Sequence, residues 1–492
     1  MIITSQHRAA NKKQGGIALL VLMIALALGF SVYYFSSISI VNIRVENIET
    51  TRAVLKQAKQ SLINYAITHA NGNGNGKPGE YGYLPCPDSI SNAIVEGEQD
   101  GTCGGQYKNH LGYLPWKALD MPALKDGSGN CLWYAVSGNY KGENYSELIN
   151  EDTNGLFQIV DVDGNIIEDR VAAVILAPGK ALSGQVRNID VATHCGEDYG
   201  NQASYLEGDG VVDNSNLPDI VDSVDQFIQA TLTSDSAAIP YNDHLITITG
   251  DEIWQAIMKS TDINARLTEV TEALAICLSN FANDTSNSNK RLPWPATKDL
   301  DGIGDYRDMS YYSDELNAVT GYAGRFPFLV DDSNALLGIA ATDMLINMGF
   351  CNSLIVTGGV NVDLESTNTE HHIILENWKD HFFYSVSKDY ALPNNAWTGC
   401  SGNCVKVEDP VGTFTKYAAI IFFSGSPITS IAQSRNDADK SDLFNYLENG
   451  NDTNFPDALG NSVYATTNPD PLISNDIMFC ITDDAVPAVI KC

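Results

Sequence analysis

The chain starts with a short polar segment, and a long apolar one follows it. Residues 15–42 form a run of 28 without a charged side chain. As a helix, at about 1.5 Å per residue, such a run measures about 40 Å, more than the roughly 30 Å of a bilayer core. The residues before it include Arg8, Lys12 and Lys13 and no acidic residue. We therefore expect a transmembrane helix over 17–42, with its short basic end in the cytoplasm.

The pattern after this run is that of an amphipathic helix over 43–76. Leu55, Leu62 and Tyr65 recur at helical spacing, and charged residues lie between them. Alternating Asn and Gly residues over 71–76 then break the helix. Together the two stretches predict one long N-terminal spine helix.

The rest of the chain carries a faint internal repeat. Leu55, Leu62 and Tyr65 correspond, 212 residues later, to Leu267, Leu274 and Cys277. Six phrases also return in the same order, at offsets of 208 to 250: 84–87 as 292–295, 112–116 as 324–328, 132–140 as 382–390, 172–187 as 418–435, 205–207 as 446–448, and 242–249 as 475–482. This order predicts two homologous modules.

Short apolar runs bounded by turn residues indicate strands within both modules. Residues 171–176 and 417–423 are continuous apolar runs, typical of central strands, and 245–249 alternates like a half-buried strand. The expected fold class is therefore α+β. It comprises the spine helix and two modules, 77–250 and 251–492, each with a helix and an antiparallel β-sheet.

Charge excludes some classes of function. The chain has 29 Lys and Arg against 61 Asp and Glu, a formal net charge of −32. Such an acidic surface repels phosphate backbones, so we expect no nucleic-acid partner.

The junction before the apolar run resembles the leader of type IV pilins and type II secretion pseudopilins. Residues 12–16 read Lys-Lys-Gln-Gly-Gly, and Ile17 opens the apolar run. The resemblance implies a leader over 1–16 that a prepilin peptidase cuts after Gly16, and a methylated Ile17 as the first mature residue. Most family members carry Glu at the fifth mature position, where this chain has Val21. That departure resembles the large minor subunit at a filament tip.

The order of phrases in the first module also resembles that of uncharacterised prepilin-like proteins of Gram-negative bacteria. What both resemblances imply is a minor pilin or pseudopilin anchored in the inner membrane and then built into a cell-surface filament near its tip. Its partners would be other pilin subunits, contacted through the N-terminal helix. Its large acidic domain would serve assembly priming, adhesion or secretion. The alternatives are a permanently membrane-anchored periplasmic or surface binding protein and, less favoured, an ectoenzyme such as a hydrolase.

The ten cysteines divide evenly, four in the first module and six in the second. In an extracytoplasmic protein they favour disulfides over metal. Sequence alone does not fix their connectivity. The pairing that we suggest joins neighbours along the chain: Cys86–Cys103, Cys131–Cys195, Cys277–Cys351, Cys400–Cys404 and Cys480–Cys492. A redox or zinc pair is the alternative for Cys400 and Cys404.

The best candidate for a metal site is an acidic turn. Asp299, Asp301 and Asp305 surround glycines, as in short extracellular calcium turns, and Ser310 stands where an EF-hand needs Glu. A solvated acidic turn is the alternative. The second acidic turn, 161–165, is more typical of a β-hairpin. We expect no required cofactor, and Ca²⁺ is the ion that the first of these turns would bind.

Enzymatic motifs are absent from the sequence. It contains no Gly-x-Ser-x-Gly, no His-Glu-x-x-His and no P-loop. The pair His371-His372 is typical of a surface loop, and the aromatic residues Tyr311, Tyr312 and Trp397 either bind a ligand or fill the core. We therefore expect no catalytic residues and no enzymatic activity.

Overall fold

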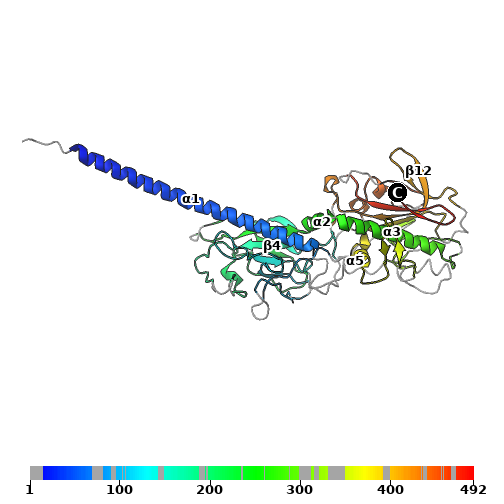
Figure 1. Ribbon diagram of the computed structural model, residues 1–492, viewed down its shortest axis with the longest axis horizontal. Helices are drawn as coiled ribbons and strands as arrows, with labels where there is room; N and C mark the ends of the chain where they lie inside the picture. The colour runs from blue at the N-terminus through cyan, green and yellow to red at the C-terminus, as the bar shows by residue number, and fades with distance from the viewer. Residues whose placement is uncertain are drawn as a thin grey trace, which may run out of the picture.

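The computed structural model describes residues 15–492, apart from single residues and short gaps and these longer segments: 69–80, 90–95, 142–148, 188–193, 299–311, 315–320, 331–348, 392–398 and 467–472. Within 29–43 it describes the backbone alone. The described part consists of a long helix, α1 (Gly15–Thr68), and two β-sheet modules that follow one another along the direction of that helix (Figure 1).

Helix α1 corrects the predicted membrane anchor. Among the described residues, no helix is both long and apolar enough to cross a membrane. On this finding, the transmembrane spine expected over 17–42 and the single-pass inner-membrane location are wrong.

The second half of α1 packs on the first module. Leu55, Leu62 and Tyr65 are buried, as their spacing predicted. Lys59 Nζ lies 2.5 Å from Glu252 Oε1, an ion pair to the next helix. The described part of α1 extends to Thr68, and the Asn-Gly repeat expected to end the helix lies outside the described residues.

The first sheet has six strands in the order β1-β2-β4-β3-β5, and β6 also pairs with β4. Antiparallel pairing dominates, but β3 and β5 are parallel, which corrects the expectation of a purely antiparallel sheet. The bounds are β1 (His110–Tyr113), β2 (Trp133–Val136), β3 (Phe157–Val160), β4 (Ile166–Ala177), β5 (Asp225–Ile228) and β6 (His244–Thr249).

The second sheet has seven strands in the order β13-β11-β12-β10-β7, and β14 pairs with both β12 and β15. Here β11 and β13 are the parallel pair. The bounds are β7 (Ala323–Arg325), β10 (Phe382–Val386), β11 (Val405–Glu408), β12 (Phe414–Phe423), β13 (Val463–Ala465), β14 (Ile477–Thr482) and β15 (Val489–Lys491).

The two sheets share one topology, strand for strand. The strands β1, β2, β3, β4, β5 and β6 occupy the places of β7, β10, β11, β12, β13 and β14. The register agrees too, because Gly112 faces Tyr134 and its counterpart Gly324 faces Tyr384. The repeated phrases in the sequence therefore occupy equivalent positions in the two sheets.

The repeated Leu-Pro-x-Pro segment makes the same contacts in both modules. Tyr134 Oη donates to the Pro85 carbonyl at 3.0 Å, and Tyr384 Oη donates to the Pro293 carbonyl at 3.1 Å. The same Leu-Pro-x-Pro segments lie against the equivalent glycines: a Cβ on Gly112 would come within 2.6 Å of the Asp88 carbonyl oxygen. The repeated phrases therefore make equivalent packing contacts in the two modules.

Helices join the modules and cover them. The helix α2 (Gly250–Met258) starts at a capping box formed by Thr249 and Glu252 and leads into α3 (Thr261–Asn283). The helix α3 packs on β12 and β14 as α1 packs on β4 and β6. The second module also has β8 (Leu354–Ile355), β9 (Asn361–Val362), α5 (Glu370–Asn377) and α6 (Asn451–Asn454).

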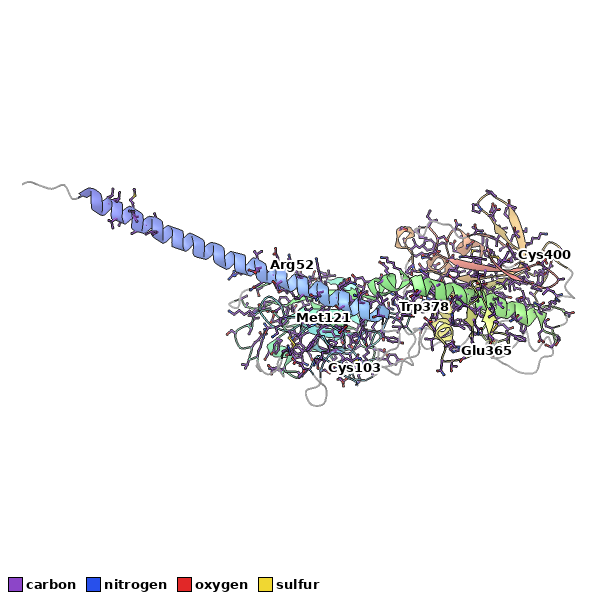
Figure 2. All side chains as sticks on the ribbon, viewed as in Figure 1. Arg52, Cys103, Met121, Glu365, Trp378 and Cys400 are labelled. Atoms are coloured by element: carbon purple, nitrogen blue, oxygen red, sulfur yellow. A yellow bond between two sulfur atoms is a disulfide. The ribbon has the colours of Figure 1, made fainter. Side chains whose placement is uncertain are left out.

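A single hydrophobic core runs through the junction between the modules. The Trp254 ring of α2 meets the Trp378 ring at 5.4 Å in an edge-to-face contact, and Figure 2 places Trp378 at this junction. Buried residues of α1 and of both sheets belong to the same cluster. The two modules are therefore held together by apolar packing as well as by the polar contacts described below.

All ten cysteines form disulfides. The pairs are the five suggested from the sequence: Cys86–Cys103, Cys131–Cys195, Cys277–Cys351, Cys400–Cys404 and Cys480–Cys492. Each bond lies within one module, so the contact between the modules is entirely non-covalent apart from the chain itself.

Candidate functional site

Three of the repeated phrases meet in one polar cluster of the first module. Gln185 Nε2 donates to Glu207 Oε1 at 2.7 Å, and the Asn242 backbone N–H donates to Glu207 Oε2 at 2.9 Å. The Glu207 N–H donates to Asp243 Oδ2 at 2.8 Å. Arg187 lies over the Tyr205 ring, 4.8 Å from its centroid. Side chains far apart in sequence thus close a single network.

The second module builds the same cluster from the matching phrases. Gln433 Nε2 donates to Glu448 Oε1 at 2.8 Å, and the Asn475 N–H donates to Glu448 Oε2 at 3.1 Å. The Glu448 N–H donates to Asp476 Oδ2 at 3.1 Å. Arg435 lies 4.7 Å from the centroid of the Tyr446 ring.

Each cluster places two carboxyl groups side by side, and in both clusters the pKa of the aspartic acid is raised. Burial raises the pKa of Asp243 well above its usual range, and the adjacent Glu207 raises it further. Burial and the neighbouring Glu448 do the same to the pKa of Asp476. In each pair the pKa shift favours the uncharged form of the buried aspartic acid, which lessens the repulsion between the two adjacent carboxyl groups.

The two clusters differ in the groups that accept hydrogen bonds from the arginine side chain. Arg187 is half-exposed, and its Nε and Nη1 donate to the carbonyls of Ser204 and Gly179, both within its own module, at 2.7 Å each. Arg435 is buried, and its Nη1 donates to Glu151 Oε1, an acid of the first module. One repeated arginine is thus satisfied locally, and the other binds across the junction.

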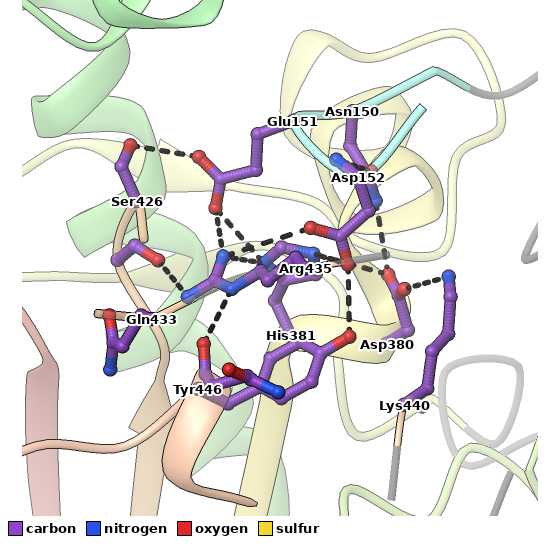
Figure 3. Close-up of polar contacts among 12 residues, drawn as sticks. Asn150, Glu151, Asp152, Asp380, His381, Ser426, Gln433, Arg435, Lys440 and Tyr446 are labelled. Carbon is purple, nitrogen blue, oxygen red and sulfur yellow. Dashed lines mark hydrogen bonds and ion pairs between the residues drawn. The ribbon is translucent and has the colours of Figure 1, made fainter. Parts of the chain in front are cut away.

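A cluster of charged side chains surrounds Arg435 at this junction, and we call it the junction cluster (Figure 3). Asp152 Oδ2 lies 3.3 Å from His381 Nε2 and accepts a hydrogen bond from Tyr446 Oη at 3.0 Å. Glu151 Oε2 accepts a hydrogen bond from Ser426 Oγ at 2.8 Å. Its six charged members are Glu151, Asp152, Asp380, His381, Arg435 and Lys440, all buried.

The segment that carries the two acids is anchored to the second module on its other side as well. Asn150 Nδ2 donates to the Asn377 carbonyl at 2.9 Å and to Asp380 Oδ1 at 3.1 Å. Asp380 in turn lies 3.2 Å from Lys440 Nζ. Residues 150–152 therefore contact the second module through all three of their polar side chains.

The electrostatics of the junction cluster show how these charges remain ionised although they are buried. Burial by itself would lower the pKa of His381, but the carboxylates of Asp152 and Asp380 outweigh it and raise that pKa to about 9. Burial would raise the pKa of Asp152, but His381 and Arg435 hold it below its usual range. Lys440 and His381 likewise lower the pKa of Asp380 against the effect of burial. The opposite charges around Asp152, Asp380 and His381 therefore shift each of these groups towards its charged form.

The junction cluster does not fit a metal ion. Glu151, Asp152 and His381 can bring one ligand atom each within 4.8 Å of one another. However, Arg435 Nη1 already donates to Glu151 Oε1 and lies 3.3 Å from His381 Nδ1, so a metal ion at these ligand atoms would lie beside a buried guanidinium group. Three acidic side chains already face three basic ones, so the cluster needs no further cation. Its paired acidic and basic side chains instead hold the two modules together.

Five of the candidate site residues lie outside the part of the chain that the structure describes. This holds for the calcium candidates Asp299, Asp301 and Asp305 and for Tyr311 and Trp397. Gly16 and Ile17 lie in the first turn of α1, where the structure describes the backbone only. Tyr312, considered as a ligand-binding aromatic, is buried in the core.

Two further expectations concern described residues. The turn at 161–165 is a β-hairpin turn, in which Asp161 Oδ1 accepts the N–H groups of Asp163 and Asn165 at 2.9 Å. His371 and His372 are not surface-loop residues, which corrects that expectation. They are buried in α5, where His371 Nε2 lies 2.8 Å from Glu269 Oε2 and His372 Nδ1 lies 2.7 Å from the Leu364 carbonyl oxygen.

The sequence did not single out the acids of the junction cluster. Glu151 and Asp152 lie in the first module and have no acidic counterpart in the second, so the repeat carried no signal for them. Arg435, Tyr446 and Glu448 were visible as repeated residues. Nothing in the sequence distinguished Arg435, which binds across the junction, from Arg187, which does not.

Comparisons with protein-family models, with curated proteins and with solved structures find no match to this chain.

Proposed function

We propose that this chain is a subunit of a pilin-like filament that assembles through the N-terminal part of α1. Two observations support the proposal. The first is the pilin-like leader sequence that ends at Gly16, before Ile17, and the second is the row of exposed apolar side chains that follows it. The second carries the greater weight because it is a property of the folded chain.

Among the side chains of α1 that the structure describes, this apolar row has no counterpart. Leu20, Met23 and Ile24 are 51–65% exposed, whereas Leu55 and Leu62 on the same helix are at most 4% exposed. The N-terminal part of α1 extends beyond the side chains of both modules (Figure 2). Contiguous exposed apolar surface of this kind marks an interaction site. Helices of other subunits, each with its own apolar row, would cover it.

The arrangement of the modules favours a place at the end of such a filament. The second module lies beyond the first in the direction in which α1 points (Figure 1). In a bundle of parallel α1 helices it would occupy the space ahead of its own helix, where another subunit would stack. The junction cluster and the shared core hold it there. The proposed role is therefore that of a large minor subunit that displays its acidic modules at the tip.

Site-specific photo-crosslinking in cells tests the assembly contact. A photoreactive amino acid in place of Leu22 should crosslink the chain to another filament subunit through α1. The matched control carries the same group in place of Gln57, an exposed position where α1 lies against the first module. Equal crosslinking at both positions, or crosslinks only within the chain, would contradict the proposal.

A further inference from the structure

The outer edge of β6 differs from the same edge in the second module. Each of β6 and β14 pairs on one side with the long central strand of its sheet, β4 or β12. On its other side β14 pairs with β15, antiparallel. Within the described residues, no strand pairs with the outer side of β6.

Burial along the two strands reflects this difference. Met478, Phe479 and Cys480 of β14 are buried. Their counterparts Leu245, Ile246 and Thr247 on β6 are only half-buried. The register on the central strand is the same in the two modules, since Ile246 pairs with Ile175 and Phe479 with Ile421. The lower burial of β6 therefore matches the missing strand and not a shift of register.

The edge of β6 also lacks the residues that usually protect an open edge. Natural edge strands avoid pairing with other chains by means of Lys, Pro or inward charges. Residues 244–249 read His-Leu-Ile-Thr-Ile-Thr and contain no Lys, Arg, Pro or acid. Such an edge presents unpaired backbone N–H and C=O groups beside half-buried apolar side chains.

The second module shows what kind of segment fits this edge. The strand β15 is three residues long, and the Cys480–Cys492 disulfide ties it to β14. Ser279 Oγ of α3 donates to the Pro487 carbonyl, at the entry to β15, at 2.6 Å. The residue of α1 at the position of Ser279 is Ile67. A segment that entered the first module would therefore meet an apolar side chain at this point.

We propose that the outer edge of β6 binds a short extended segment of another protein chain, which adds to the first sheet as β15 adds to the second. Main-chain hydrogen bonds would supply affinity, and alternate side chains would supply specificity, as in other strand additions. The segment is apolar at its entry, next to Ile67. Its residues are apolar along the strand, as Val489 and Ile490 of β15 are. This proposal does not depend on the filament proposal.

The homologous disulfide provides a direct test on the full-length protein. Thr247 holds the place of Cys480, so a T247C variant recreates the thiol that pairs with Cys492. The probe is a synthetic peptide of residues 485–492, AVPAVIKC. In a glutathione redox buffer, T247C should form at least tenfold more mixed disulfide with this peptide than V162C does, whose position is exposed on the β3–β4 hairpin. Equal capture at the two positions would overturn the proposal.

Three controls keep the outcome interpretable. Peptide mapping must show the five native disulfides intact in both variants. A scrambled peptide of the same composition should lose the preference for T247C, and its retention would overturn the proposal. Without peptide, a T247C-linked dimer that the peptide does not compete away would also overturn it, because the occupant would then be a second copy of this chain.

Discussion

Removing Glu151 should weaken the contact between the two modules. The side chains of Glu151 and Arg435 are 2% and 1% exposed. Removal of one partner from a buried ion pair costs about 3–5 kcal/mol, because the other charge stays buried without its partner. We expect E151Q to lower the free energy of unfolding by an amount near the lower end of this range, since Asp152 Oδ1 remains 4.0 Å from Arg435.

A double-mutant cycle assigns this loss to the contact across the junction. Urea unfolding, followed by tryptophan fluorescence, would be measured for E151Q, R435M and the double variant. We expect a coupling energy of about 2–3 kcal/mol between Glu151 and Arg435. The repeat offers a matched control, because Arg187 holds the place of Arg435 but binds within its own module. Coupling between E151Q and R187M should stay within about 0.5 kcal/mol, the range for independent sites.

Two results would refute this reasoning. Coupling near zero between Glu151 and Arg435 would mean that the ion pair contributes nothing to the contact. Coupling of equal size with Arg187 would mean that Glu151 acts on stability without contacting a particular arginine.

Three further predictions follow from the same structure. The pKa of His381 is raised to about 9 from about 6.5 in an unfolded chain. Its contribution to stability is therefore complete below pH 6.5 and is lost as the pH rises through 9. Melting temperatures between pH 6 and 10 should show this fall, and an equal fall in H381Q would contradict it. Replacing Cys480 and Cys492 by Ser opens a loop with a sequence separation of 12, so urea unfolding should show a loss of about 3 kcal/mol, whereas no loss would contradict the tethering of β15. Ala at Gly112 would place its Cβ 2.6 Å from the Asp88 carbonyl oxygen and should lower the free energy of unfolding by about 1–3 kcal/mol. Ala at Gly101, which has open space around it, should leave it nearly unchanged. Equal effects of the two substitutions in thermal melts would contradict the close approach.

The sequence predicted those features of the fold that depend on local pattern and on repetition. Leu55 and Leu62 marked the buried face of α1 through their spacing, and the runs at 171–176 and 417–423 marked the central strands. The repeated phrases showed two related modules because each phrase packs against another, as Tyr134 packs on Pro85. The disulfides followed chain order because each one closes within its own module.

Features that depend on one module meeting the other could not be predicted. Glu151 and Asp152 are ordinary acids in a chain with 61 of them, and only the junction gives them partners. His371 and His372 were misassigned because a short helical segment with no clear periodicity resembles a loop. The uncharged run before Arg44 indicated a membrane span on its length alone, and among the described residues no helix is long and apolar enough for one. The parallel strands β5 and β13 carry too few residues to give a signal.

The central claim is that this chain is a processed, pilin-like subunit. The most direct test is the N-terminal residue and mass of the mature protein, isolated from its own cells with and without the prepilin peptidase. Our account predicts a chain that begins at Ile17, carries N-methylation and depends on that peptidase. An intact Met1 in both strains would contradict it.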